Sequence, residues 1–120
     1  MSAEELEALL DRALRARQAL LEPRHESAFR LFNGFLEGWP ALAVDLYAAT
    51  VVIHDYAEAP ASGEEAVQAA QRFLLERLPW LRAIVLKVRN SPSAQERNGR
   101  LVHGAMARAG IQDVRVPDLG

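Results

Sequence analysis

The sequence predicts a small α+β domain, with a mostly antiparallel sheet, one helix packed on it and an N-terminal amphipathic helix before it. Three observations support this class. Apolar residues recur at helical spacing near the N-terminus and again after residue 62. Residues 42–47 alternate as a half-buried strand does, and residues 83–88 form a nearly continuous β-rich run. The 120 residues, half of them apolar and a quarter charged, suit one globular domain.

The first predicted element is an amphipathic helix over residues 3–21. Ser2 followed by Glu5 has the spacing of a capping box, which supplies hydrogen-bond partners to the free amides of a first helical turn. Pro23 ends the helix because the residue before a proline disfavours helical geometry. The apolar stripe consists of Leu6, Leu9, Leu10, Ala13, Leu14, Leu20 and Leu21.

Three strands follow, at 28–33, 42–47 and 51–53, and the last two are expected to form a tight hairpin. The segment Tyr47-Ala48-Ala49-Thr50 that joins them contains no glycine, so a primed two-residue turn is not strongly encoded. Gly34 and Gly38, between the first two strands, are interpreted as turn glycines that adopt positive φ.

A second helix is expected to begin at Ser62, which repeats the capping-box spacing with Glu65, and to end before Pro79. The strand at 83–88 reads as a central one covered on both sides. A polar loop then runs from 90 to 99, and a short strand covers 100–104. In the tail, 105–109 is compatible with a helical turn and 114–116 with a short extended piece.

The carboxylate pair Glu37 and Asp45 is the first candidate for chemistry, because two carboxylates with different pKa values can act as general acid and base. The spacing of these two residues in the sequence does not show how far apart their carboxylates lie in the folded protein. The favoured interpretation is that Asp45 points outward or accepts a backbone hydrogen bond near the hairpin. Glu37 then belongs to the turn.

The sequence gives little support for a cysteine-based site, a metal site or aromatic stacking on RNA. The absence of cysteine excludes disulfides, zinc–thiolate sites and a cysteine nucleophile in this chain. The three histidines, His25, His54 and His103, do not have metal-site spacing. Trp39 and Trp80 could stack on RNA bases, but their places at the ends of apolar elements favour edge-of-core packing. We therefore assign no catalytic, cofactor-binding or metal-binding residue.

Basic residues offer the remaining candidate site. The net charge of −2 is too small to attract a partner by itself, but cations cluster locally. The alternatives are a solvated surface and contact with RNA phosphates. The candidate RNA contacts are Arg24, Arg30, Lys87, Arg89, Arg97 and Arg100. Neither a signal peptide nor a membrane-length apolar run is evident, so we expect a cytoplasmic protein that does not cross a membrane.

The stretch FRLFNGFLEGWPALAVDLY, residues 29–47, resembles a segment of class I S-adenosylmethionine-dependent methyltransferases of the large-subunit ribosomal RNA cytosine-5 type and their relatives. The resemblance covers roughly residues 26–104, and Ala48 departs from it because the family usually has glycine there. The matching positions are Arg30, Leu31, Asn33, Glu37, Gly38, Pro40, Leu42, Val44, Asp45 and Tyr47.

This resemblance implies a small accessory domain that precedes a catalytic domain. It implies an N-terminal helix at 1–25, the accessory domain at 26–104, and a tail or the start of a linker at 105–120. The glycine-rich cofactor loop and the catalytic cysteine would lie beyond Gly120, so S-adenosylmethionine is expected for the parent protein and not for this chain.

Two functions stay open. The chain is a non-catalytic, RNA-positioning domain or truncated form of an RNA methyltransferase, or it is an interaction or dimerisation module without nucleic-acid binding. Its partners would be RNA in the first case, and a C-terminal catalytic domain or a second copy in the second.

Overall fold

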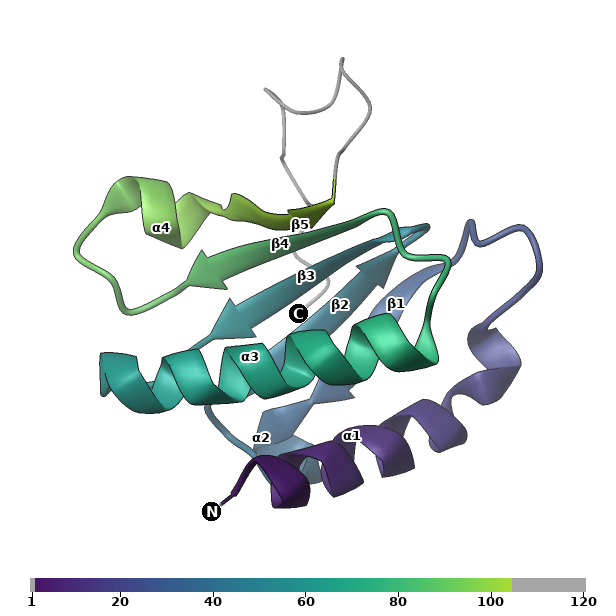
Figure 1. Cartoon of the computed structure of the whole chain (residues 1–120), viewed down its shortest axis with the longest axis horizontal. Helices are drawn as coiled ribbons and strands as arrows, with labels where there is room; N and C mark the ends of the chain where they lie inside the picture. The colour runs from purple at the N-terminus through teal and green to yellow at the C-terminus, as the bar shows by residue number, and fades with distance from the viewer. Residues whose placement is uncertain (1, 105–120) are drawn as a thin grey trace.

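The computed structural model describes residues 2–104, which form a five-stranded mixed sheet with two long helices on one face (Figure 1). This architecture confirms the predicted α+β class. The elements are α1 (Ala3–Ala16), the 3₁₀ turn η1 (Gln18–Leu20), β1 (Ala28–Asn33), α2 (Gly34–Glu37), β2 (Leu42–Tyr47), β3 (Thr50–Asp55), α3 (Pro60–Arg77), β4 (Ala83–Val88), α4 (Ala94–Asn98) and β5 (Arg100–Gly104). The predictions for 105–109 and 114–116 lie outside the described residues.

The strands lie in the order β1-β2-β3-β4-β5, so each pairs with its neighbour in sequence. The pairs are antiparallel except β3 with β4, which are parallel because α3 carries the chain back across the sheet. The predicted tight hairpin is confirmed, since Tyr47 pairs with Thr50 and only Ala48 and Ala49 form the turn. Ala48 adopts a left-handed φ of 53°, a conformation that glycine adopts more easily.

One hydrophobic core joins α1 and α3 to the same face of the sheet (Figure 1). The strand alternation has the predicted consequence, because Leu42, Val44 and Leu46 all point into this core. Each buried side chain of this size stabilises the fold by about 1.5–3 kcal/mol relative to exposure. The helical contributors are Leu6, Leu10, Ala13 and Leu14 from α1, and Ala66, Val67, Ala69, Ala70, Phe73 and Leu74 from α3.

The first helix begins as predicted, with the Ser2 side chain accepting a hydrogen bond from the Glu5 amide at 3.2 Å. It ends at Ala16, five residues earlier than expected. Arg17 leaves helical geometry, with φ of −108° and ψ of 10°, and the chain tightens into η1. Leu20 is 50% exposed, so it does not continue the buried stripe.

The second helix begins at Pro60, and the predicted start at Ser62 is wrong. Proline suits a first helical position because its missing amide would have no intrahelical partner there. The Ser62 hydroxyl donates to the Ala59 carbonyl at 3.0 Å and does not act as the cap. The helix ends at Arg77, ahead of Pro79 as expected.

The expected polar loop at 90–99 contains a short helix, α4. Ser93 caps it by accepting from the Glu96 amide at 3.4 Å, and Ser91 donates to the Glu96 carboxylate at 2.8 Å. The strand at 83–88 is present as β4, which pairs with a strand on each side and buries all of residues 83–86, as expected of a strand covered on both faces. Within residues 2–104, no helix combines the length and apolar character needed to cross a membrane.

Candidate functional site

The sheet face opposite α1 and α3 carries a polar cluster of Arg30, Asp45 and His54, of which Asp45 and His54 are buried. Asp45 is fully buried. Its Oδ1 accepts from Arg30 Nε at 2.7 Å and its Oδ2 from an Arg30 terminal nitrogen at 3.1 Å. His54 Nε2 lies 2.9 Å from the same Oδ2. The expectation that Asp45 points outward is wrong, because both faces of this strand are buried.

Hydrogen bonds decide the charge state of Asp45. Burial alone would raise the pKa of the Asp45 carboxyl, but the bonds with His54 and Arg30 outweigh burial and hold the pKa below its ordinary value. The second ring nitrogen of His54, Nδ1, is buried and makes no hydrogen bond within the described part of the chain. The ionised carboxylate of Asp45, on β2, is thus held by Arg30 from β1 and His54 from β3.

Glu37 has different partners and forms no pair with Asp45. It ends α2, where one carboxylate oxygen accepts from an Arg17 terminal nitrogen at 3.0 Å and the other from the Asn33 amide at 3.0 Å. The sequence predicts a turn at Glu37, and the structure instead places it at the end of the one-turn helix α2. The two carboxylates do not form an acid–base pair.

The two turn glycines are needed for different reasons. Gly38 has the predicted positive φ, at 107°. Gly34 does not, and it is required because the backbone passes close by: a Cβ at this position would lie 1.9 Å from the Trp39 carbonyl oxygen and 2.1 Å from that of Leu42. The prediction of positive φ at Gly34 is wrong.

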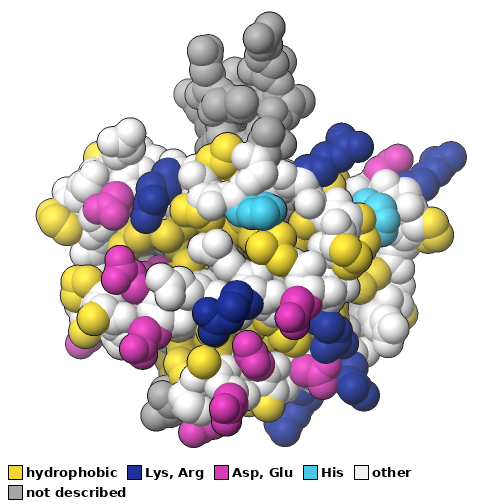
Figure 2. Space-filling view, viewed as in Figure 1, with side chains coloured by type: hydrophobic (Ala, Val, Ile, Leu, Met, Phe, Trp, Pro, Cys, Tyr) yellow, Lys and Arg dark blue, Asp and Glu magenta, His cyan; other side chains and the backbone are white. Residues whose placement is uncertain are grey.

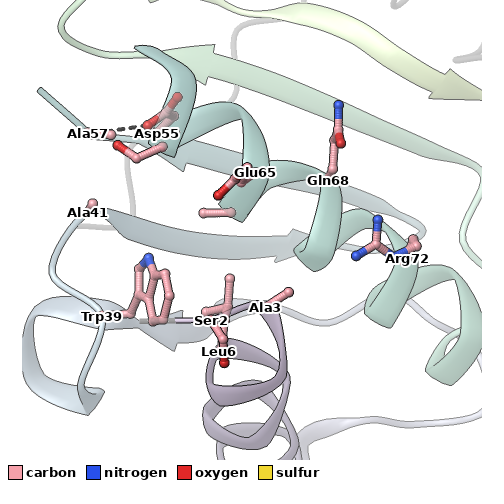
Figure 3. A pocket seen from close by; sticks show the side chains of 13 residues that line it. Ser2, Ala3, Leu6, Trp39, Ala41, Asp55, Ala57, Glu65, Gln68 and Arg72 are labelled. Atoms are coloured by element: carbon pink, nitrogen blue, oxygen red, sulfur yellow. Dashed lines mark hydrogen bonds between the residues drawn. The ribbon is translucent and has the colours of Figure 1, made fainter. Parts of the chain in front are cut away.

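A pocket of about 590 Å³ opens between the N-terminal halves of α1 and α3 and the end of the sheet (Figure 3). The buried Asp55 lies at one end of it, where β3 stops. Burial raises the pKa of the Asp55 carboxyl, and the hydrogen bond from the Ala57 amide, at 2.9 Å, opposes that shift only in part. The lining residues are Ser2, Ala3, Leu6, Trp39, Ala41, Asp55, Ala57, Ser62, Gly63, Glu65, Ala66, Gln68 and Arg72.

Sequence reasoning missed this pocket. Asp55 was not singled out, and its only local signal is its position between the apolar run of β3 and a turn. Trp39 was expected to pack at the edge of the core, and it does so while also lining the pocket. Trp80 also packs at the core edge, where its ring stacks on His25 with centroids 3.8 Å apart.

The predicted RNA contacts divide between the two edges of the sheet. Arg24 and Arg30 lie before and within β1, and Arg30 is engaged with Asp45. The other four lie in β4, the turn after it, α4 and β5, and we call them the basic edge: Lys87, Arg89, Arg97 and Arg100. On the helix-bearing face, acidic and basic side chains are interspersed and no patch of one sign forms (Figure 2).

Gly99 allows the Lys87 side chain of the basic edge to pack against the turn that leads to Arg100. A Cβ at Gly99 would lie 3.3 Å from Lys87 Cγ, so the Lys87 stem packs against the turn between α4 and β5. Arg100 pairs with Leu86, the neighbour of Lys87 in β4. The Arg97 guanidinium donates to the Ser91 carbonyl at 2.8 Å. None of the four residues forms an ion pair with an acidic group in residues 2–104.

The structure offers little to hold a metal. Across the described part of the chain, no three histidine, aspartate or glutamate side chains gather closely enough to bind an ion. His54 has Asp45 as its partner, and His25 has the ring of Trp80.

Comparison with known proteins yields structural matches only, since neither a family model nor a curated protein matches. A proposed S-adenosylmethionine-dependent methyltransferase from Streptococcus mutans matches with a TM-score of 0.67 and 17% identity, over 89% of this chain and 26% of that one. A crystal structure of a proposed methyltransferase complexed with S-adenosylhomocysteine matches with a TM-score of 0.67 and 16% identity, over 90% of this chain and 26% of that one.

At this identity the matches establish the fold. The chain spans about a quarter of each matched protein. It therefore resembles one part of proposed methyltransferases, a folded unit that accompanies a larger remainder.

Proposed function

We propose that this chain is the accessory, RNA-positioning domain of an S-adenosylmethionine-dependent RNA methyltransferase. The observation that carries the proposal is the agreement of almost the whole described fold with one quarter of two proposed methyltransferases. The methyl donor and the transfer chemistry then belong to the other three quarters of such a protein. This unit contributes by binding the RNA.

The basic edge supports the RNA part of the proposal. Its four cations lie on consecutive elements and lack acidic partners among the described residues. Cations without acidic partners can neutralise phosphates and release the counterions that surround RNA. Arg30 is left out of this proposal because its guanidinium already binds both oxygens of Asp45.

The proposal is tested by fluorescence anisotropy of the full chain with a labelled ribosomal RNA fragment at low salt. The double variant Arg89→Gln/Arg100→Gln should weaken binding several-fold, because two phosphate contacts disappear. The matched control is Arg12→Gln/Arg15→Gln on α1, which removes the same charge elsewhere and should change affinity little. Equal losses in both double variants would show that binding depends on overall charge and not on this edge.

A second candidate function has its own supporting observation. Phe35 and Leu36 of α2 are 79% and 77% exposed, and neighbouring exposed apolar side chains of this size are typical of protein interaction sites. The occupant would be a methyltransferase catalytic domain, since the matched proteins are about four times as long as this unit.

Sedimentation over a range of concentrations tests this second function. In a solution of this chain alone, the exposed pair should drive self-association, and Phe35→Ser/Leu36→Ser should abolish it. A wild-type chain that stays monomeric at every concentration would contradict this function.

A further inference from the structure

The pocket at the end of the sheet combines three features that the RNA-binding edge does not use. Its base is apolar, with Leu6 and Ala66 buried there. One wall is the half-buried indole of Trp39, and one end is the carboxyl group of Asp55. Figure 3 shows these groups on separate elements around one hollow, with Arg72 at the far end from Asp55.

The Asp55 carboxyl has an unused hydrogen-bonding oxygen. The residue is only 6% exposed, and Oδ1 accepts from the Ala57 amide. Oδ2 has no hydrogen-bond partner within the described residues, although it belongs to a group that lines the pocket. An oxygen of this group that has no partner among residues 2–104 can accept a hydrogen bond from a ligand in the pocket.

Gly63 leaves room for the Asp55 carboxyl group because it has no side chain. It lies in the first turn of α3, and a Cβ there would come 2.5 Å from Oδ2 and 2.7 Å from Oδ1 of Asp55. Asp55 therefore lies directly over the helix backbone, at a place where any larger residue would displace it.

Trp39 supplies the complementary surface. Its indole projects into the pocket from the loop that precedes β2 (Figure 3). An aromatic face of this kind stacks on flat heterocycles, and a base–aromatic stack contributes about 1–3 kcal/mol. A volume of about 590 Å³ is within the range of small-molecule sites and is large enough for a single nucleotide.

We propose that this pocket receives one unstacked RNA base that carries an exocyclic amino group. The base stacks on Trp39, its amino group donates to Oδ2 of Asp55, and Arg72 lies where it can meet the phosphate. Proteins read single-stranded RNA in this way, by stacking a splayed base and hydrogen bonding its edge. Uracil is disfavoured because it presents a carbonyl oxygen where cytosine presents the amino group. This inference rests on the proposed RNA function and adds base selection to it.

The test compares CMP with UMP, which differ in that exocyclic group, by following the two indole N–H signals of the full chain in NMR titrations. We expect the Trp39 signal to shift and CMP to bind at least tenfold more tightly than UMP. The Trp80 signal serves as an internal control, since Trp80 stacks on His25 and does not line the pocket. Equal responses to the two nucleotides, or no shift at Trp39, would overturn the inference.

The variant Asp55→Asn distinguishes recognition from mere folding. The asparagine oxygen can keep the bond from Ala57, and its amide nitrogen then faces the ligand as a donor. We expect the preference to reverse toward UMP, a result that a purely structural role for Asp55 would not produce. Glu64→Gln, an exposed carboxylate of the same helix that does not line the pocket, is the matched control and should leave the preference for CMP unchanged. An unaltered preference in Asp55→Asn would refute the role of this carboxyl.

The two proposals can fail separately. If basic-edge variants weaken RNA binding while CMP and UMP behave alike, the pocket inference fails alone. If CMP is selected but the basic edge proves irrelevant to RNA affinity, the proposed phosphate contacts fail and the pocket remains.

Discussion

Arg30 and Asp45 face each other across the β1–β2 ladder, and the guanidinium holds both oxygens of a fully buried carboxylate, at 2.7 and 3.1 Å. This cross-strand pair ties the edge strand β1 to the interior of the sheet. Removing one partner of a buried pair leaves the other without compensation, which is costlier than the pair is stabilising.

Asp45→Asn should therefore lower the free energy of unfolding by about 3 kcal/mol. The measurement is urea denaturation followed by circular dichroism. The control is Asp11→Asn, which disrupts the exposed ion pair with Arg77 and should have a much smaller effect. Similar losses in the two variants would contradict the assigned importance of the buried pair.

The same carboxylate predicts acid sensitivity. The folded pKa of Asp45 lies below its ordinary value of 3.8, so the unfolded chain takes up its proton first as the pH falls. The stability contributed by Asp45 should be complete above that value and be lost as the pH drops through the lower, folded pKa. Denaturation midpoints of the wild type and Asp45→Asn should thus converge in strong acid, and a constant difference would count against this linkage.

Asp55 predicts the opposite dependence. Burial raises its folded pKa above 3.8, so its contribution is most favourable below that value and declines as the pH rises through the folded pKa. Asp55→Asn should therefore be more stable than the wild type at pH 7, with the gain disappearing near pH 3. Thermal melts at the two pH values measure this difference. A variant less stable than the wild type at pH 7 would contradict the claim that the buried, ionised Asp55 carboxylate destabilises the fold.

Ala48 predicts a simple stabilising substitution. Its φ of 53° is unfavourable for a residue with a Cβ, and glycine removes that strain while adding entropy to the unfolded chain. Ala48→Gly should raise the free energy of unfolding by roughly 0.5 kcal/mol. Ala49→Gly, at the neighbouring turn position without a positive φ, should lower it. If both variants lose stability, the turn strain inferred for Ala48 is absent.

Gly34 predicts a severe defect. A methyl group there would clash with the carbonyl oxygens of Trp39 and Leu42, so the backbone around α2 would have to move. Gly34→Ala should cost at least about 3 kcal/mol, measured by chemical denaturation. Leu36→Ala in the same helix is the control, and its exposed side chain predicts a change within about 0.5 kcal/mol. Near-normal stability of Gly34→Ala would argue against this close packing.

Local patterns predicted most of the fold because the strands and helices have clear periodicity. The alternation at Leu42, Val44 and Leu46 correctly placed one face of β2 in the core. It could not show that Asp45, on the other face, is also buried, since that depends on Arg30 and His54 from neighbouring strands. The helix α4 was missed because its five residues, four of them polar, carry no apolar stripe.

The candidate pocket was beyond sequence reasoning for a related reason. It depends on Asp55 lying against Gly63 and on Trp39 lining the same hollow, and this arrangement arises only when the sheet end and α3 pack together. The basic residues were visible in the sequence. The sequence does not show that these residues divide between two sheet edges, or that the Arg30 guanidinium binds Asp45; both follow from the structure.

The most direct test of the account is the salt dependence of RNA affinity, measured for the wild type and for a chain with Lys87, Arg89, Arg97 and Arg100 all replaced by Gln. Four phosphate contacts with single-stranded RNA predict that the logarithm of the association constant falls with the logarithm of salt with a slope steeper by roughly 3 in the wild type than in the variant. Absence of RNA binding by the wild type at low salt, or an equal slope in both chains, would contradict the account.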